Sequence, residues 1–128
     1  MEKKLLEKKI WAVAGANQNP EKYGNKIYKR LKEKGYEVFA VNPMYDEVEG
    51  DTCYKDLSSL PELPDVVNMV VSPKRAAPIL EQAKKLGIKY IWFQPGTHDE
   101  QTQKKVKELG LKAVYACILV ATQLYNNK

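Results

Sequence analysis

The feature that most constrains this chain is a junction that occurs three times: a helical pattern ends in glycine and a β-rich apolar run follows at once. The three glycines are Gly35, Gly87 and Gly110, and each is predicted to end a helix. Ile10–Ala14 and Asp65–Val71 add two further strand patterns. Five short strands are therefore expected, at about 10–14, 36–41, 66–71, 89–93 and 111–115, with helices between them.

Strands that are separated by crossover helices form a parallel sheet. The expected fold is α/β, a Rossmann-like, doubly wound, parallel five-stranded sheet with the strand order 3-2-1-4-5. A length of 128 residues fits a single domain that spans the whole chain, 1–128. The segment from Pro43 to Pro64 is expected to be a loop with at most one short helical turn near Leu57–Leu60, so a second crossover helix is missing.

Two helices carry local signals of their own. Tyr23, Ile27 and Leu31 are spaced by four residues, which predicts a stripe that packs on the sheet. Thr97 and Glu100 have the spacing of a capping box at the start of the helix after the fourth strand.

The segment from Ile10 to Gly24 predicts an anion-binding site. A short apolar strand runs into a turn at Gly15 and then into an amphipathic helix, whose free N–H groups and positive end favour a phosphate. The spacing is not that of the three-glycine dinucleotide fingerprint, because Asn17 and Pro20 occupy the later glycine positions.

Small, polar or proline-containing residues follow four of the predicted strands. Each pair or triplet is also an ordinary turn former, but the carboxyl ends of parallel strands share one edge of the sheet, where ligands bind. We therefore expect a ligand crevice built from Gly15-Ala16-Asn17, Asn42-Pro43, Ser72-Pro73 and Gln94-Pro95-Gly96.

Composition narrows the class of protein. The net charge of +5, from 21 basic and 16 acidic residues, favours an anionic partner, although lysines interleaved with glutamates also make an ordinary solvated surface. No stretch approaches the length of a membrane span and no secretory signal is apparent, which predicts a cytoplasmic protein without membrane contact. Two separated cysteines and one histidine predict reduced thiols and no metal.

The ordered set of strand-end motifs resembles a known family. Gly15-Ala16 with Pro20, Lys22 and Gly24, then Val41-Asn42-Pro43, then Trp92 with Gln94-Pro95-Gly96, is similar to the small stand-alone CoA-binding proteins and to the CoA-binding domain of the succinyl-CoA synthetase alpha subunit. The likeness extends from about Lys9 to Cys117.

The resemblance implies coenzyme A or an acyl-CoA as the ligand. By this likeness the CoA phosphates would be held by Gly15, Ala16, Asn17, Asn19 and Lys22. Asn42 and Pro43 would flank the nucleotide, Ser72 and Pro73 would cover its other side, and Gln94, Pro95 and Gly96 would line the crevice toward pantetheine.

The expected role is that of a non-catalytic binding module, because no catalytic group stands out. His98, the only histidine, is expected on the exposed surface, and Cys117 is either a structural thiol or a partner for the CoA thiol. The alternative is a small NAD(P)-linked oxidoreductase, which is disfavoured because the second strand does not end in Asp or Glu. A nucleic-acid binder is disfavoured since no recognition motif is present. A homodimer or an unidentified partner protein is compatible with either reading.

Overall fold

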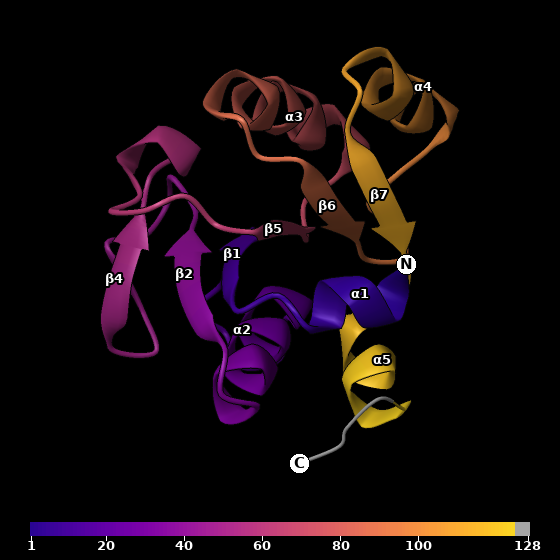
Figure 1. Cartoon of the computed structure of the whole chain (residues 1–128). Helices are drawn as coiled ribbons and strands as arrows, with labels where there is room; N and C mark the ends of the chain where they lie inside the picture. Colours follow the sequence, from indigo (N-terminus) through magenta and orange to yellow (C-terminus); the bar gives the residue numbers. More distant parts are fainter. Residues whose placement is uncertain (125–128) are drawn as a thin grey trace.

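The computed structural model describes residues 1–124 (Figure 1). In chain order the elements are α1 (Glu2–Leu6), β1 (Ile10–Ala14), α2 (Tyr23–Glu33), β2 (Glu37–Val41), β3 (Glu47–Val48), β4 (Asp51–Tyr54), the 3₁₀ helix η1 (Leu57–Ser59), β5 (Val66–Met69), α3 (Pro73–Leu86), β6 (Tyr90–Phe93), α4 (Glu100–Glu108), β7 (Lys112–Tyr115) and α5 (Ile118–Leu124). Within the described part of the chain, no helix is both long and apolar enough to cross a membrane.

The elements form an α/β Rossmann-like domain around one sheet of seven strands in the order β3-β4-β2-β1-β5-β6-β7. Six strands are parallel to one another, and only β3 runs antiparallel, to β4. The prediction of five strands in the order 3-2-1-4-5 is therefore wrong both in the number of strands and in their order. The strand expected third, β5, pairs with β1 on the side away from β2.

The error arises from β4, which lies in the segment predicted to be a loop. It takes the place beside β2 that the prediction gave to the third strand, and it pairs there through Ala40↔Cys53 and Val41↔Tyr54. A strand of four residues that contains Asp51 and Thr52 carries too little apolar pattern to be recognised. The short helical turn expected near Leu57–Leu60 is confirmed as η1, which Asp56 caps.

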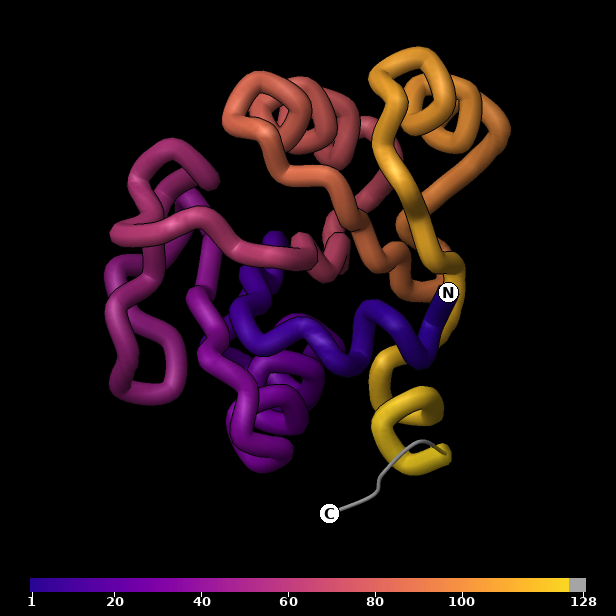
Figure 2. Tube along the Cα trace, viewed as in Figure 1, coloured from indigo at the N-terminus to yellow at the C-terminus, as the bar shows by residue number. Residues whose placement is uncertain are grey.

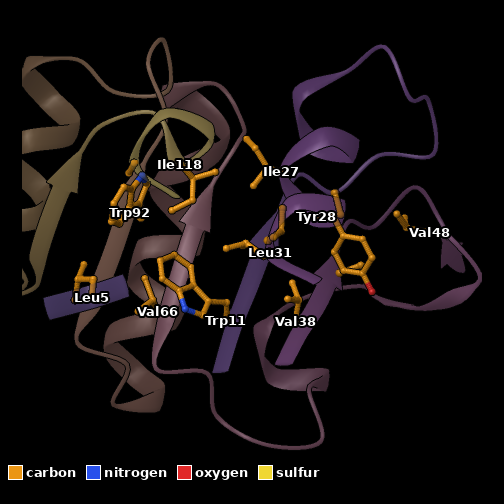
Figure 3. Packing of buried hydrophobic residues seen from close by; sticks show 14 of the residues in the cluster. Leu5, Trp11, Ile27, Tyr28, Leu31, Val38, Val48, Val66, Trp92 and Ile118 are labelled. Carbon is orange, nitrogen blue, oxygen red and sulfur yellow. The ribbon is translucent and has the colours of Figure 1, made fainter. Parts of the chain in front are cut away.

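Helices cover both faces of the sheet. Figures 1 and 2 show α1, α2 and α5 below the sheet and α3 and α4 above it. Strand residues alternate between the two layers: Trp11 and Val13 pack toward α2, whereas Ala12 and Ala14 pack toward α3. Trp11 and Trp92 contact each other in the core cluster between the sheet and α2, with ring centroids 5.8 Å apart, near Leu31 and Ile118 (Figure 3).

Two local predictions about helices need correction. Ile27 and Leu31 are fully buried as expected, but Tyr23 is 63% exposed, because it opens α2 at the rim of the sheet rather than over it. The expected capping box at Thr97 and Glu100 is also wrong. Helix α4 begins only at Glu100, so Asp99 is its N-cap and accepts a hydrogen bond from the Thr102 N–H at 2.8 Å.

Candidate functional site

The turn after β1 can be made only by glycine. Gly15 has φ of +102°, and a Cβ placed on it would lie 2.6 Å from the Val70 carbonyl oxygen. Its N–H donates to the Val41 carbonyl at 2.9 Å, which ties the turn to the end of β2. The backbone therefore turns away from the sheet at the point where the neighbouring strands end.

A second glycine lets helix α2 rest directly on this turn. A Cβ on Gly24 would lie 2.0 Å from the Gly15 carbonyl oxygen and 3.2 Å from the Asn17 nitrogen. The first turn of α2 and the Gly15 turn are thus in backbone contact. Gly24 was not predicted as a site residue, although the family-like motif places it nine residues after Gly15.

The start of α2 has unpaired backbone donors. Its N-cap, Lys22, makes no side-chain cap hydrogen bond, and the N–H groups of Tyr23 and Gly24 have no acceptor among residues 1–124. The same holds for the Asn17 N–H within that range. Helix α3 starts in a similar way, because its N-cap Ser72 makes no side-chain cap hydrogen bond. Two positive helix ends therefore face the same edge of the sheet.

A cleft of about 450 Å³ lies at this edge. The predicted site residues that line it are Gly15, Asn17, Lys22, Ser72, Gln94, Pro95 and Gly96. The rest of the lining consists of Tyr23, Gly24, Val70, Val71, Thr97 and Cys117. Among these, Val70 and Val71 extend β5 past its last paired residue, and apolar residues at a strand end give no sequence signal of a binding role.

The other predicted site residues lie outside the cleft lining. Ala16 is fully buried, Asn19 and Pro43 are exposed, and Pro73 is the first residue of α3. Asn42 is only 7% exposed, and its side chain ties two loops together. Its Nδ2 donates to the Ala16 carbonyl at 2.8 Å, and its Oδ1 accepts from the Met44 N–H at 2.9 Å. Asn42 therefore supports the Gly15 turn from behind.

Two polar side chains of the lining are also held by the protein itself. The Gln94 side chain is buried, and its Oε1 accepts from the Ile118 N–H at 3.0 Å, at the start of α5. Asn17 Oδ1 accepts from the Asn19 N–H at 2.8 Å. The polar groups left to meet a ligand include backbone N–H groups, the amide nitrogens of Asn17 and Gln94, the Ser72 hydroxyl and the Lys22 ammonium. Lys22 is exposed and forms no salt bridge with any residue that the structure describes.

The two thiols differ in position. Cys117 is half-buried and lines the cleft, immediately before α5. Cys53 is buried in β4, where its Sγ lies 3.6 Å from the Asn42 carbonyl oxygen, and burial raises the pKa of this thiol. Only Cys117 is therefore placed to meet a ligand in the cleft.

His98 is not the exposed surface residue that the sequence predicted. It is half-buried against Tyr115, with ring centroids 4.6 Å apart, and its Nδ1 lies 3.1 Å from Gln103 Nε2. It does not belong to the cleft lining. The aromatic neighbours at the ends of β6 and β7 explain its burial, and they were not apparent from its place beside Asp99.

Comparisons with known proteins identify a family and similar folds. Residues 9–123 match the family model described as a CoA binding domain. The chain is 30% identical, over an alignment of 124 residues, to the uncharacterized protein YneT of Bacillus subtilis (strain 168). The match covers 93% of this chain and 90% of YneT. A solved structure of a hypothetical protein from Pyrococcus horikoshii OT3 superposes with a TM-score of 0.91 at 35% identity, over 99% of this chain and 93% of that one.

A longer relative places the same domain inside a larger protein. The alpha subunit of acetate–CoA ligase (ADP-forming) II of Pyrococcus furiosus is 30% identical over an alignment of 108 residues, and the match covers 79% of this chain. The matched region is only 24% of that subunit. The chain thus corresponds to one part of the ligase subunit.

Proposed function

This chain belongs to the family of CoA binding domains, and we propose that it binds coenzyme A or an acyl-CoA in the cleft at the carboxyl ends of the strands. It acts as a binding module that contributes no catalytic group of its own. The observation that carries the proposal is the start of α2, where unpaired N–H groups, a positive helix end and Lys22 border one cleft.

The chemistry of these donors fits the phosphates of CoA. Backbone N–H groups and an ammonium group are the usual partners of phosphate oxygens. Because Gly24 rests on Gly15, neither residue places a side chain between these N–H groups and the cleft. In this proposal Gly15, Asn17 and Lys22 hold the phosphates. Ala16, Asn19 and Asn42 shape the loop, and Pro43 flanks it.

The opposite wall of the cleft suits the rest of the molecule. Ser72 and Pro73, at the start of α3, would cover one side of the ligand, and Gln94, Pro95 and Gly96 would guide pantetheine. Cys117 lines the same cleft, so its thiol would lie in the cleft together with the thiol of a bound CoA. A reduced, cytoplasmic setting is part of the proposal, and a homodimer or a partner protein stays a prediction.

The ligase activity of the longer relatives is not assigned to this chain. The chain matches about a quarter of the ligase subunit, and the cleft lining contains neither a histidine nor a carboxylate side chain. We therefore infer that this chain binds CoA without catalysing a reaction. In this proposal the biological effect depends on the partners of the CoA-bound protein.

The test is a calorimetric titration of the purified protein with CoA, acetyl-CoA, NAD and NADP at one salt concentration, and with a DNA duplex at several. Selective micromolar binding of CoA or acetyl-CoA is expected. Binding of NAD or NADP alone would favour the oxidoreductase alternative. An affinity for nucleic acid that falls steeply with salt, without any CoA binding, would replace the proposal by a nucleic-acid binder.

A further inference from the structure

The β3–β4 hairpin lies at the outer edge of the sheet (Figure 1). Four side-chain hydrogen bonds join it to the Gly15 turn and to α2. They run from Gln18 Nε2 to the Glu47 carbonyl at 2.8 Å, from Asn25 Nδ2 to Glu49 Oε2 at 2.8 Å, from the Tyr28 hydroxyl to Asp51 Oδ2 at 2.6 Å, and from Lys32 Nζ to Asp51 Oδ2 at 2.7 Å. Tyr28 and Val48 also pack in the same core cluster (Figure 3). The hairpin thus contacts the elements that form one wall of the cleft.

Asn25 is the link between the hairpin and the binding turn. It is fully buried in the first turn of α2, directly after Gly24. Its Nδ2 donates both to Glu49 Oε2 and, at 2.9 Å, to the carbonyl of Asn17, while its Oδ1 has no donor among the described residues. All hydrogen bonding of this buried amide therefore passes through one nitrogen, which Glu49 and Asn17 share.

Glu49 adopts a backbone conformation that a glutamate disfavours. Its φ of +53° is the only positive φ of a non-glycine residue between residues 1 and 124, and Gly50 follows with φ of +80°. Two positive φ angles in a two-residue hairpin loop favour Asn, Asp or Gly at the first position. A glutamate there gives up local backbone stability, which points to a task for its side chain.

We propose that Glu49 is a positioning residue: its carboxylate orients the Asn25 amide, and Asn25 in turn fixes the Asn17 backbone at the anion-binding turn. Glu49 itself is not part of the cleft lining, so its side-chain oxygen acts on the turn through Asn25 and not on the ligand directly. The effect on CoA affinity rests on the function proposed above. The effect on the turn in the ligand-free protein does not.

Three variants separate this role from a merely structural one. Glu49→Gly removes the carboxylate and relieves the positive φ, Glu49→Gln keeps an oxygen acceptor of the same reach, and Glu47→Gln removes a neighbouring charge whose residue contacts Gln18 only through its backbone. Hydrogen–deuterium exchange without ligand, thermal unfolding and CoA titration are measured for each variant.

For Glu49→Gly we expect exchange in residues 15–22 to accelerate at least about threefold, and the Kd for CoA to rise by a similar factor, because one hydrogen bond to a charged group is lost. Its unfolding midpoint should equal or exceed that of the wild type. Glu49→Gln and Glu47→Gln should behave like the wild type.

Unchanged exchange in residues 15–22 of Glu49→Gly would overturn the proposal, as would faster exchange along the whole chain with a lower unfolding midpoint. If exchange accelerates in residues 15–22 but the wild type does not bind CoA, the positioning role stands and the proposed function fails.

Discussion

Two strand–turn–helix junctions at the same edge of the sheet treat their free helix donors in opposite ways. At the junction from β6 to α4, Asp99 accepts from both the N–H and the hydroxyl of Thr102 at 2.8 Å, and Thr97 Oγ1 donates to the Gln94 carbonyl at 2.6 Å. At the junction from β1 to α2, no side chain caps the helix. The first junction pairs a backbone donor of its helix with a side-chain cap, whereas the second pairs none in this way.

The contrast separates stability from binding. A self-capped helix start gains stability from residues of the chain and has fewer donors to offer an anion. An uncapped start loses that stabilisation unless a phosphate supplies it. Changes of exposed side chains at the β1–α2 junction should therefore act mainly on CoA binding, and changes of the Asp99 cap at the β6–α4 junction mainly on folding.

The largest effect is expected from Gly24→Ala, which breaks the backbone contact at the β1–α2 junction. The new Cβ would lie 2.0 Å from the Gly15 carbonyl oxygen, so α2 must shift. We expect the free energy of unfolding, measured by chemical denaturation, to fall by about 3 kcal/mol and CoA binding to be lost.

Gly35→Ala is the matched control, since Gly35 has φ of +92° but no atom beyond its two chain neighbours lies within 4 Å of the point that a Cβ would occupy. It should cost about 1 kcal/mol through backbone strain and leave CoA affinity unchanged. Equal behaviour of the two variants would mean that the Gly15–Gly24 contact has no special role.

Lys22→Glu should affect binding alone. It removes a positive charge from the cleft and adds a negative one, so the Kd for CoA should rise at least about tenfold while the unfolding midpoint stays near that of the wild type. Lys29→Glu makes the same charge change on an exposed part of α2 outside the cleft lining. If both variants weaken binding equally, only the overall charge of the protein matters.

Asp99→Ala should give the smallest effect, and on folding alone. Hydrogen bonds from the Thr102 backbone and side chain hold the pKa of Asp99 below its usual value of 3.8. A lowered folded-state pKa means that the cap stabilises the protein above the unfolded pKa and is lost as pH falls through the folded pKa. The variant should melt at a lower temperature than the wild type at pH 7.

That difference in melting temperature should shrink below about pH 4, and CoA affinity at pH 7 should not change. A loss of CoA affinity with an unchanged melting temperature would reverse the assignment of the two junctions.

The sequence predicted the β1–α2 junction better than it predicted the sheet. Gly15 and the helix after it are recognisable because a turn with positive φ and a following amphipathic pattern are local properties. The position of β4 is not local, since its few pairs with β2 arise from the tertiary fold. The same limit applies to the site, where the contact of Gly24 with Gly15 and the internal bonds of Asn42 depend on packing between distant segments.

The most direct test of the contrast is a two-dimensional amide NMR titration of the protein with CoA. Saturable shifts of the Asn17, Tyr23 and Gly24 amides are predicted, with the Thr102 amide unmoved. Shifts at Thr102 with none at these three amides, or no shifts at any CoA concentration, would contradict the assignment of the uncapped start of α2 as the phosphate site.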